Sequence, residues 1–351
     1  MYTNSTTKRV YAGKLAIGGG APVSIQSMLC APAHNIEANV TQAVELQDAG
    51  CDMVRISVPD MQTVKTVEAV KNAIKIPLVA DIHFDWRLAI ESVAAGVDKV
   101  RINPGNIGDE SRIKEVALAC NAKNIPIRIG VNSGSLEKEI LARYGSATSE
   151  AMVESGFYHI SLLEKFDFDN IVLSLKSSDT KRMYDAYVSA AQKCPYPLHL
   201  GVTEAGTENT GVIKSAAGIG GLLLRGIGDT IRISLTDEPV REVYAAQKLL
   251  KAIGLRNNGI KFISCPTCGR TEINLITLAK RAEERFKDID KNITVAIMGC
   301  VVNGPGEASA ADIGIAGGKN CGVIFKNGKI LYSKVPEDKL LDVLEEEINK
   351  M

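Results

Sequence analysis

The chain has 351 residues, 45% of them hydrophobic and 23% charged, a composition that excludes a disordered protein and provides a core large enough for two domains. Its 41 basic residues balance its 41 acidic residues, so the overall charge gives no reason to expect nucleic acid or an anionic membrane as a partner. No apolar run approaches the roughly 18 residues of a membrane span and the start of the chain is polar, which predicts a cytoplasmic protein.

A repeated strand and helix pattern occupies most of the chain. Residues 8–20 come before it and are expected to form a hairpin over the floor of the first domain. Helix candidates such as residues 39–49 and 240–253 follow β-rich runs, and several end at a glycine, as at Gly50 and Gly96. The eight β-rich runs are residues 23–28, 53–58, 77–82, 98–103, 126–131, 170–175, 197–202 and 230–235.

Eight βα units predict a closed (β/α)8 TIM barrel over residues 1–254, because an open doubly wound sheet more often has about five to seven strands. After a polar connector at residues 255–259, the sequence predicts a small α/β domain to residue 351. Its expected elements are a strand at 260–264, a Cys-rich turn, a helix at 272–286, a strand at 294–298, a hairpin at 323–331 and a charged final helix.

Basic residues recur near the ends of the barrel strands, where TIM barrels place their catalytic groups. Buried cations at such positions need an anion or a carboxylate, and guanidinium forks match phosphate oxygens, so we expect a phosphate-binding mouth. Pairing with Asp52, Asp81, Asp98 and Asp229 is the alternative. The cations are Arg55, Arg101, Arg128, Arg232 and Lys176, with Asn103, Asn132, Ser133 and Ser234 as further donors.

Two groups at the expected mouth could move protons. Glu204 follows the seventh run, and His83 follows the third. Each could instead have an ordinary role, Glu204 as a solvated loop residue and His83 as a packing residue or hydrogen-bond donor.

Three of the eight cysteines have the spacing of a metal site. Cys265 and Cys268 share one tight turn, and Cys300 follows a later strand. Three thiolates favour an iron-sulfur cluster or zinc, with inert or redox thiols as a third possibility. Cys321 lies in a Gly-rich stretch and is not expected to be a ligand. The solitary Cys30, Cys51, Cys120 and Cys194 are expected to be small buried or half-buried thiols.

The motifs Cys265-Pro-Thr-Cys268-Gly-Arg270 and Met298-Gly-Cys300-Val-Val-Asn-Gly-Pro-Gly-Glu307 resemble those of the 4-hydroxy-3-methylbut-2-enyl diphosphate synthases of the methylerythritol phosphate isoprenoid pathway. The barrel agrees with that family over nearly its whole length, in Val54-Arg-Ile-Ser57, Ala80-Asp-Ile-His83, Arg101-Ile-Asn-Pro-Gly-Asn106, Arg128-Ile-Gly-Val-Asn-Ser-Gly-Ser135 and Arg232-Ile-Ser-Leu-Thr236.

This resemblance implies an oxidoreductase that opens the ring of 2-C-methyl-D-erythritol 2,4-cyclodiphosphate with two electrons from a 4Fe-4S cluster and loss of water. It implies Glu307 as the fourth cluster ligand, Glu204 as the acid/base group, and ferredoxin or flavodoxin as the electron donor. The residues implied to bind the cyclic diphosphate are Arg55, His83, Arg101, Asn103, Arg128, Asn132, Lys176 and Ser234.

A homodimer is expected from geometry as well as from the resemblance. The eighth barrel helix runs away from the mouth, and the five-residue connector at 255–259 spans at most about 18 Å. We therefore expect each cluster domain to cap the partner's barrel. Two other interpretations stay open: a pterin-synthase-like phosphate barrel with a structural zinc domain, and an electron-transfer module.

Overall fold

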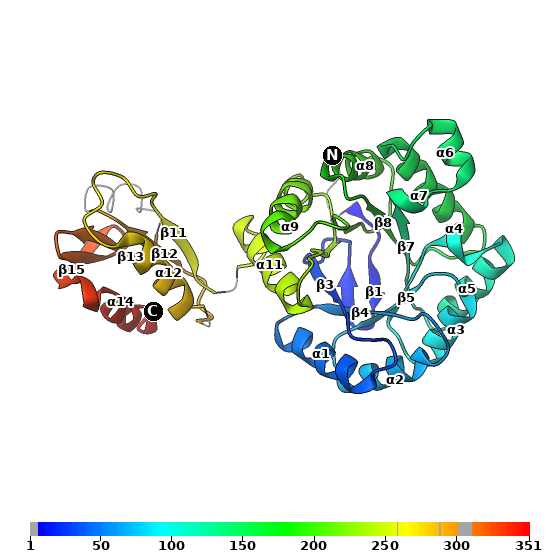
Figure 1. The fold of residues 1–351 in the computed structure, drawn as a ribbon, viewed down its shortest axis with the longest axis horizontal. Coiled ribbons are helices and arrows are strands. Elements are labelled where there is room, and N and C mark those ends of the chain that lie inside the picture. Colours follow the sequence, from blue (N-terminus) through cyan, green and yellow to red (C-terminus); the bar gives the residue numbers. More distant parts are fainter. Residues whose placement is uncertain (1–5, 258, 288, 301–310) are drawn as a thin grey trace. The chain divides into compact units, whose positions relative to one another are not determined.

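The computed structural model describes residues 6–257, 259–287, 289–300 and 311–351, and divides the chain into two compact units, residues 1–255 and 256–351 (Figure 1). No described helix is long and apolar enough to cross a membrane.

The first unit is the predicted TIM barrel. Its parallel strands follow the order β8-β7-β6-β5-β4-β3-β10-β9, and a bridge between Leu173 and Leu198 joins the two ends. The strands are β3 (Ser24–Met28), β4 (Met53–Ser57), β5 (Leu78–Ile82), β6 (Lys99–Ile102), β7 (Ile127–Asn132), β8 (Ile171–Lys176), β9 (His199–Leu200) and β10 (Thr230–Ile231). Each lies within one of the predicted runs or extends it by one residue.

Helices surround these strands (Figure 1). The α1 helix begins where Asn35 accepts a hydrogen bond from the backbone N–H of Ala38, and Gly50 just beyond its end has a φ of +83°. The barrel helices are α1 (Ile36–Asp48), α2 (Thr63–Ala73), α3 (Trp86–Ala94), α4 (Pro104–Ile107), α5 (Glu110–Ala122), α6 (Lys138–Tyr144), α7 (Ser149–Glu164), α8 (Thr180–Ala190), α9 (Glu208–Ser215), α10 (Gly221–Leu223) and α11 (Pro239–Ala252).

The predicted hairpin is β1 (Val10–Ala12) paired with β2 (Leu15–Ile17). Its side chains Val10 and Ile17 pack against Met53, Val79 and Val172, which lie at or next to the first residues of β4, β5 and β8. The hairpin therefore covers the floor of the barrel, as expected.

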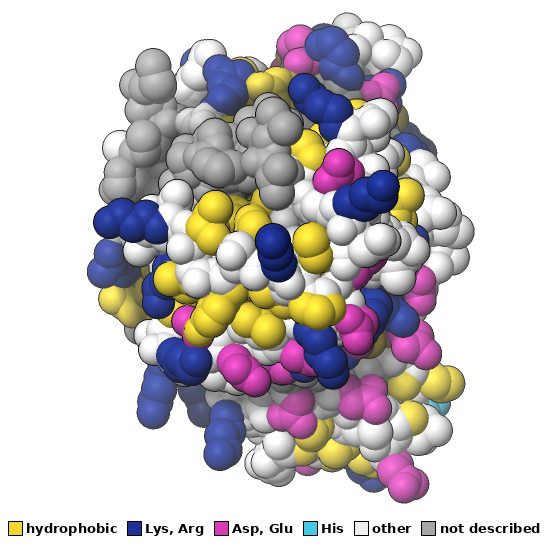
Figure 2. Space-filling model, turned by 90° about the vertical axis from the view of Figure 1, so that its left-hand side faces the viewer, with side chains coloured by type: hydrophobic (Ala, Val, Ile, Leu, Met, Phe, Trp, Pro, Cys, Tyr) yellow, Lys and Arg dark blue, Asp and Glu magenta, His cyan; other side chains and the backbone are white. Residues whose placement is uncertain are grey.

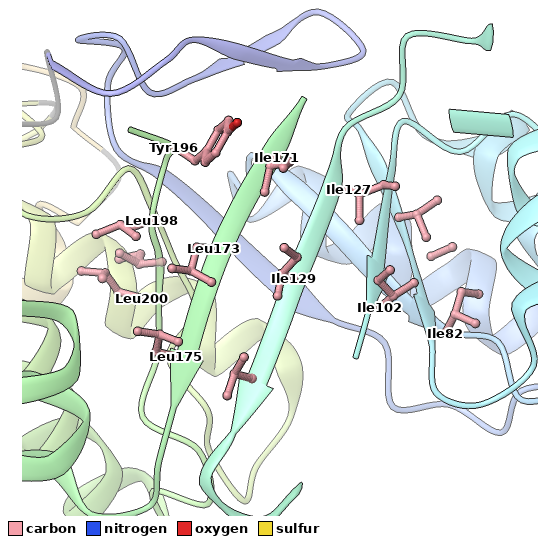
Figure 3. Close-up of a cluster of buried hydrophobic side chains, with 14 of the residues drawn as sticks. Ile82, Ile102, Ile127, Ile129, Ile171, Leu173, Leu175, Tyr196, Leu198 and Leu200 are labelled. Carbon is pink, nitrogen blue, oxygen red and sulfur yellow. The ribbon is translucent and has the colours of Figure 1, made fainter. Parts of the chain in front are cut away.

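The main core lies between the strands and the helices. Figure 3 shows aliphatic side chains of neighbouring strands, among them Ile127, Ile129, Leu173 and Leu175, gathered in this layer. Because side chains of a strand alternate between its faces, the residues between these positions face the barrel interior. This alternation directs Arg128 away from the core layer.

The described residues of the second unit form a five-stranded sheet in the order β11-β12-β13-β14-β15, accompanied by the α-helices α12 and α14. The predicted helix at 272–286 begins only at Leu275, because the Asn274 side chain caps it by accepting from Thr277 N–H. The elements are β11 (Lys261–Ser264), α12 (Leu275–Arg285), β12 (Thr294–Met298), β13 (Ile313–Gly318), β14 (Cys321–Lys326), β15 (Lys329–Pro336) and α14 (Leu340–Asn349).

The β14-β15 hairpin turns at Asn327 and Gly328, whose φ values of +48° and +73° suit the expected tight turn. At the sheet edge, β15 leaves Ile330, Leu331 and Tyr332 exposed. Figure 2 shows a face of the molecule on which hydrophobic side chains lie among both basic and acidic ones. Strand β13 was not predicted, because its sequence Ile-Gly-Ile-Ala-Gly-Gly resembles a Gly-rich turn.

Candidate active site

Five charged side chains from five neighbouring strands face the interior of the barrel. Their neighbours along each strand, such as Val54 and Ile56 around Arg55, belong to the outer hydrophobic layer. Strand pairing sets Asp81 beside Arg101, and Arg101 beside Arg128. The five residues are Arg55 on β4, Asp81 on β5, Arg101 on β6, Arg128 on β7 and Lys176 on β8.

Asp81 connects three of the predicted ligand-binding residues. Its carboxylate accepts hydrogen bonds from Arg55 Nη2 at 2.8 Å and from Arg101 Nη1 at 3.0 Å, and lies 3.0 Å from His83 Nε2. The Asp81 side chain is completely buried. Although burial opposes ionisation, the Arg55 guanidinium and the other two partners hold the Asp81 pKa well below its ordinary value.

Arg128 and Lys176 are buried cations for which the described residues provide no such carboxylate. Arg128 is 1% exposed, and its Nε and Nη2 atoms have no hydrogen-bond partner among the described residues. Burial, followed by repulsion from Arg55 and Arg101, lowers the Arg128 pKa well below its ordinary value. Burial and then repulsion, first of all from Arg128, lower the Lys176 pKa in the same way. The arrangement favours an anion between these groups.

Two glycines make room for the cations. A Cβ atom on Gly130 would lie 2.3 Å from Arg101 Nε, and one on Gly201 would lie 2.9 Å from Lys176 Nζ. Any side chain at these positions would displace the neighbouring cation.

Arg232, the remaining predicted cation, is already paired with a carboxylate. Its Nε and Nη2 atoms donate to the two carboxylate oxygens of Glu242 on α11, at 3.0 and 2.8 Å. Glu242 also accepts from Ser27 Oγ at 2.8 Å and from the backbone N–H of Leu235 at 3.1 Å. The pairing alternative is confirmed for Arg55 and Arg101, which meet the expected Asp81. It also holds for Arg232, although Glu242 was not among the acids expected.

The other acids considered as partners have different contacts. Asp52 accepts from the backbone N–H of Ile25, Asp98 from Lys71 and Leu78 N–H, and Asp229 from Thr7 and Leu198 N–H. All three precede a strand, so they lie at the opposite end of the barrel from the mouth.

The loops after the strands carry the remaining predicted residues. Asn103 is buried and donates from Nδ2 to Ser135 Oγ at 3.0 Å, whereas Asn132 and Ser234 are half-buried. Ser234 lies between Arg232 and Leu235, both held by Glu242. Glu204 is exposed, with a φ of +52° that few non-glycine residues adopt outside functional or strained loops.

A deeper polar layer was missed in the sequence. Lys99 is fully buried with its Nζ 3.1 Å from Met53 Sδ, and burial lowers its pKa well below the ordinary value. His199 is also fully buried, and its Nε2 has no partner among the described residues. The strand period could have revealed Lys99, since it precedes Arg101 by two residues and so lies on the same face of the strand.

Two of the predicted metal ligands, Cys265 and Cys300, lie just beyond the ends of adjacent strands of the second unit. Cys265 follows β11 and Cys300 follows the Gly299 that comes after β12, and these strands are parallel neighbours. The backbone N–H of Gly299 donates to Cys265 Sγ at 3.3 Å. Cys268 is exposed, and a hydrogen bond from the backbone of Arg270 lowers its pKa.

These thiols do not form a closed metal site by themselves. Within residues 6–257, 259–287, 289–300 and 311–351, no three His, Cys, Asp or Glu side chains are grouped closely enough to hold a metal ion. The fourth predicted ligand, Glu307, lies outside the described residues. The donor types still suit a cluster, because soft thiolates at neighbouring strand ends and an N–H donated to sulfur are both features of iron-sulfur sites.

The four solitary cysteines have no comparable arrangement. Cys51, Cys120 and Cys194 are buried as expected, and burial raises the pKa of each thiol to about 12. Cys30 is exposed instead, in the segment after β3, where its sulfur accepts a hydrogen bond from Gln42. Its expected burial was wrong, because it lies beyond the strand and outside the core layer.

Comparison with known proteins extends over both units. The family model of the GcpE TIM-barrel domain matches residues 7–247, and that of the GcpE protein C-terminal domain matches residues 261–350. A 4-hydroxy-3-methylbut-2-en-1-yl diphosphate synthase (flavodoxin) of Clostridium perfringens is 55% identical over 338 residues, which cover 96% of this chain and 97% of that protein. Its counterpart from Caldanaerobacter subterraneus is 55% identical over 345 residues, 98% of this chain and 97% of that protein.

A solved structure supports the barrel fold alone. The dihydropteroate synthase of Yersinia pestis matches with a TM-score of 0.51 at 14% identity, over 71% of this chain and 99% of that chain. Likeness at this level does not extend to activity. The family models and the relatives, by contrast, show the family. The chain belongs to the GcpE family, that of the 4-hydroxy-3-methylbut-2-en-1-yl diphosphate synthases.

Proposed function

We propose that the chain binds 2-C-methyl-D-erythritol 2,4-cyclodiphosphate at the barrel mouth and opens its ring reductively to 4-hydroxy-3-methylbut-2-en-1-yl diphosphate. Two electrons and two protons enter, and one oxygen of the substrate leaves as water. The observation that carries the proposal is the charge inside the barrel. Arg55 and Arg101 both bond to Asp81, and the buried Arg128 and Lys176 have no carboxylate partner among the described residues.

A diphosphate fits this charge better than a neutral ligand would. Burying unpaired cations is costly, whereas a phosphate oxygen about 4 Å from a guanidinium gains roughly 4 kcal/mol at an effective dielectric constant of about 20. Arg128 presents two guanidinium nitrogens that lack partners among the described residues. The proposed contacts to the substrate come from Arg55, His83, Arg101, Asn103, Arg128, Asn132, Lys176 and Ser234.

We assign the electron-transfer chemistry to a 4Fe-4S cluster held by Cys265, Cys268, Cys300 and Glu307. Such a cluster, when bound, supplies single electrons at low potential. The Gly299 N–H bond to Cys265 Sγ supports the assignment, because N–H donors to sulfur tune and orient cluster ligands. A structural zinc site is the weaker candidate, since the second unit contains no histidine.

Within the barrel, we assign proton transfer to Glu204. Its carboxyl group follows β9 at the mouth and is solvent-exposed, so it can exchange protons with water and deliver one to the departing oxygen. His83 uses Nε2 on Asp81, which leaves Nδ1 as the ring nitrogen available to a ligand.

The names of the relatives include flavodoxin, so we propose flavodoxin as the electron donor, with ferredoxin as the alternative one-electron carrier. A donor of this kind delivers electrons singly, which suits a cluster that accepts and passes on one electron at a time.

We also propose a homodimer in which the second unit of each subunit serves the barrel of its partner. Helix α11 begins after β10 at the mouth and runs about 21 Å toward the floor, so the connector at 255–259 starts at the far rim. Co-purified heterodimers of a Cys300→Ser subunit and a Glu204→Gln subunit should then regain one working site. Activity no higher than that of either parent, with both subunits folded, would contradict the exchange.

The proposed function is tested by turnover. The chain, purified and reconstituted anaerobically, is mixed with the cyclic diphosphate and a chemical reductant, and the product is identified by mass spectrometry. Metal analysis of the same sample should give iron and sulfide. A colourless, zinc-containing protein without turnover would favour the structural-zinc interpretation.

A further inference from the structure

Asp81 is absent from the set of residues proposed to touch the substrate, yet it contacts three members of that set. It is fully buried at the end of β5 and bonds to Arg55, Arg101 and His83, which come from β4, β6 and the loop after β5. Hydrogen bonds to charged groups of this kind are among the stronger ones in proteins.

The bonds to Asp81 use only some of the polar atoms of these three side chains. Arg55 uses Nη2, Arg101 uses Nη1 for Asp81 and Nη2 for the carbonyl of Gly130, and His83 uses Nε2. Arg55 Nε and Arg101 Nε have no hydrogen-bond partner among the described residues. Each guanidinium is therefore anchored by Asp81 while part of its hydrogen-bonding capacity is unused, which is how a preorganised binding group is held.

We propose that Asp81 is the positioning residue of the anion site: one buried carboxylate sets the orientation of both arginine forks and of the His83 ring before the substrate arrives. The inference rests on the proposed function, because it assumes that these groups bind a diphosphate. Asp81 itself does not touch the ligand.

Charge and position predict opposite outcomes for Asp81→Asn. Removing a negative charge from a cationic pocket raises its positive potential, so electrostatics alone would tighten the binding of any anion. Loss of the anchor releases both forks, so the positioning role predicts weaker binding. It also predicts a reduced preference for pyrophosphate over orthophosphate, because only pyrophosphate spans two oriented arginines.

The test measures pyrophosphate and orthophosphate binding by calorimetry on the full chain, prepared alike for the wild type and each variant. For Asp81→Asn we expect pyrophosphate affinity to fall about tenfold or more and its preference over orthophosphate to shrink. Asp81→Glu keeps the charge but moves the carboxylate, so it should also weaken binding; it also provides the test if Asp81→Asn does not fold. Thermal unfolding checks that each variant is folded.

Asp98→Asn is the matched control, because Asp98 is a barrel carboxylate that bonds to Lys71 and to Leu78 N–H at the opposite end. It should leave pyrophosphate affinity unchanged. Equal or tighter binding by folded Asp81→Asn, or unchanged binding by Asp81→Glu, overturns the positioning role while leaving the anion site intact. Failure of the wild type to bind pyrophosphate overturns the anion site itself, and this inference with it.

Discussion

The two units build their proposed sites in different ways. In the barrel, five charged groups lie on five consecutive strands, and the closed sheet alone brings them into one buried cluster. In the second unit, Cys265 and Cys300 follow adjacent strands, Cys268 is exposed on a turn, and no three-ligand group is complete among the described residues.

This difference separates a buried site whose side chains the strands hold in place from a proposed metal site at strand ends and loops. The barrel holds its cations in place through strand alternation, Asp81 and two glycines. The thiols lie on or beside short loops, where backbone hydrogen bonds from Gly299 and Arg270 reach Cys265 and Cys268. Metal binding would then contribute to the order of the second unit, as it does in many small metal-binding domains.

The largest effect is expected at the proposed cluster site, on the amount of bound iron. Cys265→Ser, Cys268→Ser and Cys300→Ser should each lose most of the bound iron, because a hydroxyl is a poor substitute for a thiolate. Cys321→Ser is the control, since Cys321 begins β14 and is not a proposed ligand. Full iron content in any of the first three variants, measured by metal analysis after anaerobic reconstitution, removes that residue from the ligand set.

Arginine shape, as well as charge, should matter in the barrel. Arg55→Lys and Arg128→Lys each keep the charge but lose the two-pronged fork, so pyrophosphate affinity should fall about tenfold or more. Arg143→Lys provides the control, because Arg143 is an exposed residue of α6 paired with Glu154. Unchanged binding in both barrel variants would show that the forks do not hold the phosphate.

Filling the space beside Gly130 should also lower pyrophosphate affinity, but by less than the loss of an arginine fork. In Gly130→Ala the added methyl group would displace the Arg101 side chain, since its Cβ would lie 2.3 Å from Arg101 Nε. We expect a loss of pyrophosphate affinity of a few fold. Gly134→Ala adds the same methyl group where nothing lies within 4 Å and should bind normally. If both variants bind alike, Arg101 does not depend on that space.

The smallest expected effect is the uptake of protons when pyrophosphate binds. Burial and neighbouring cations lower the pKa of Lys176, and a bound anion would raise it again. Pyrophosphate binding should therefore take up protons, and affinity should fall as pH rises through the Lys176 pKa in the complex. Calorimetry in buffers of different ionisation enthalpy measures the uptake, which Lys176→Met should reduce. An uptake of the same size in that variant would exclude Lys176 as its source.

Sequence reasoning succeeded where a residue's place follows from periodicity. The barrel strands, the floor hairpin and the inward arginines are consequences of period two and of turn residues. Periodicity cannot say which carboxylate meets which cation, because that depends on the register of neighbouring strands and on helix packing. The choice of Asp81 among the four acids that the sequence offered, and the pairing of Arg232 with Glu242, therefore emerged only from the structure.

The second unit shows the same limit. Strand β12 was predicted with its observed bounds, but the Gly-rich β13 was missed because its identity as a strand comes from pairing with β12 and β14. The ligand set came from spacing and resemblance, and a thiol's spacing along the chain does not determine its distance from another thiol in space.

The measurement that tests the central proposal most directly counts electrons against product. A known amount of reduced flavodoxin is added anaerobically to the reconstituted chain and excess 2-C-methyl-D-erythritol 2,4-cyclodiphosphate, and the 4-hydroxy-3-methylbut-2-en-1-yl diphosphate formed is quantified. The proposal predicts one product molecule for every two electrons consumed, and none with the Cys300→Ser variant. Flavodoxin oxidation without product, or product formed by Cys300→Ser at the wild-type rate, would contradict it.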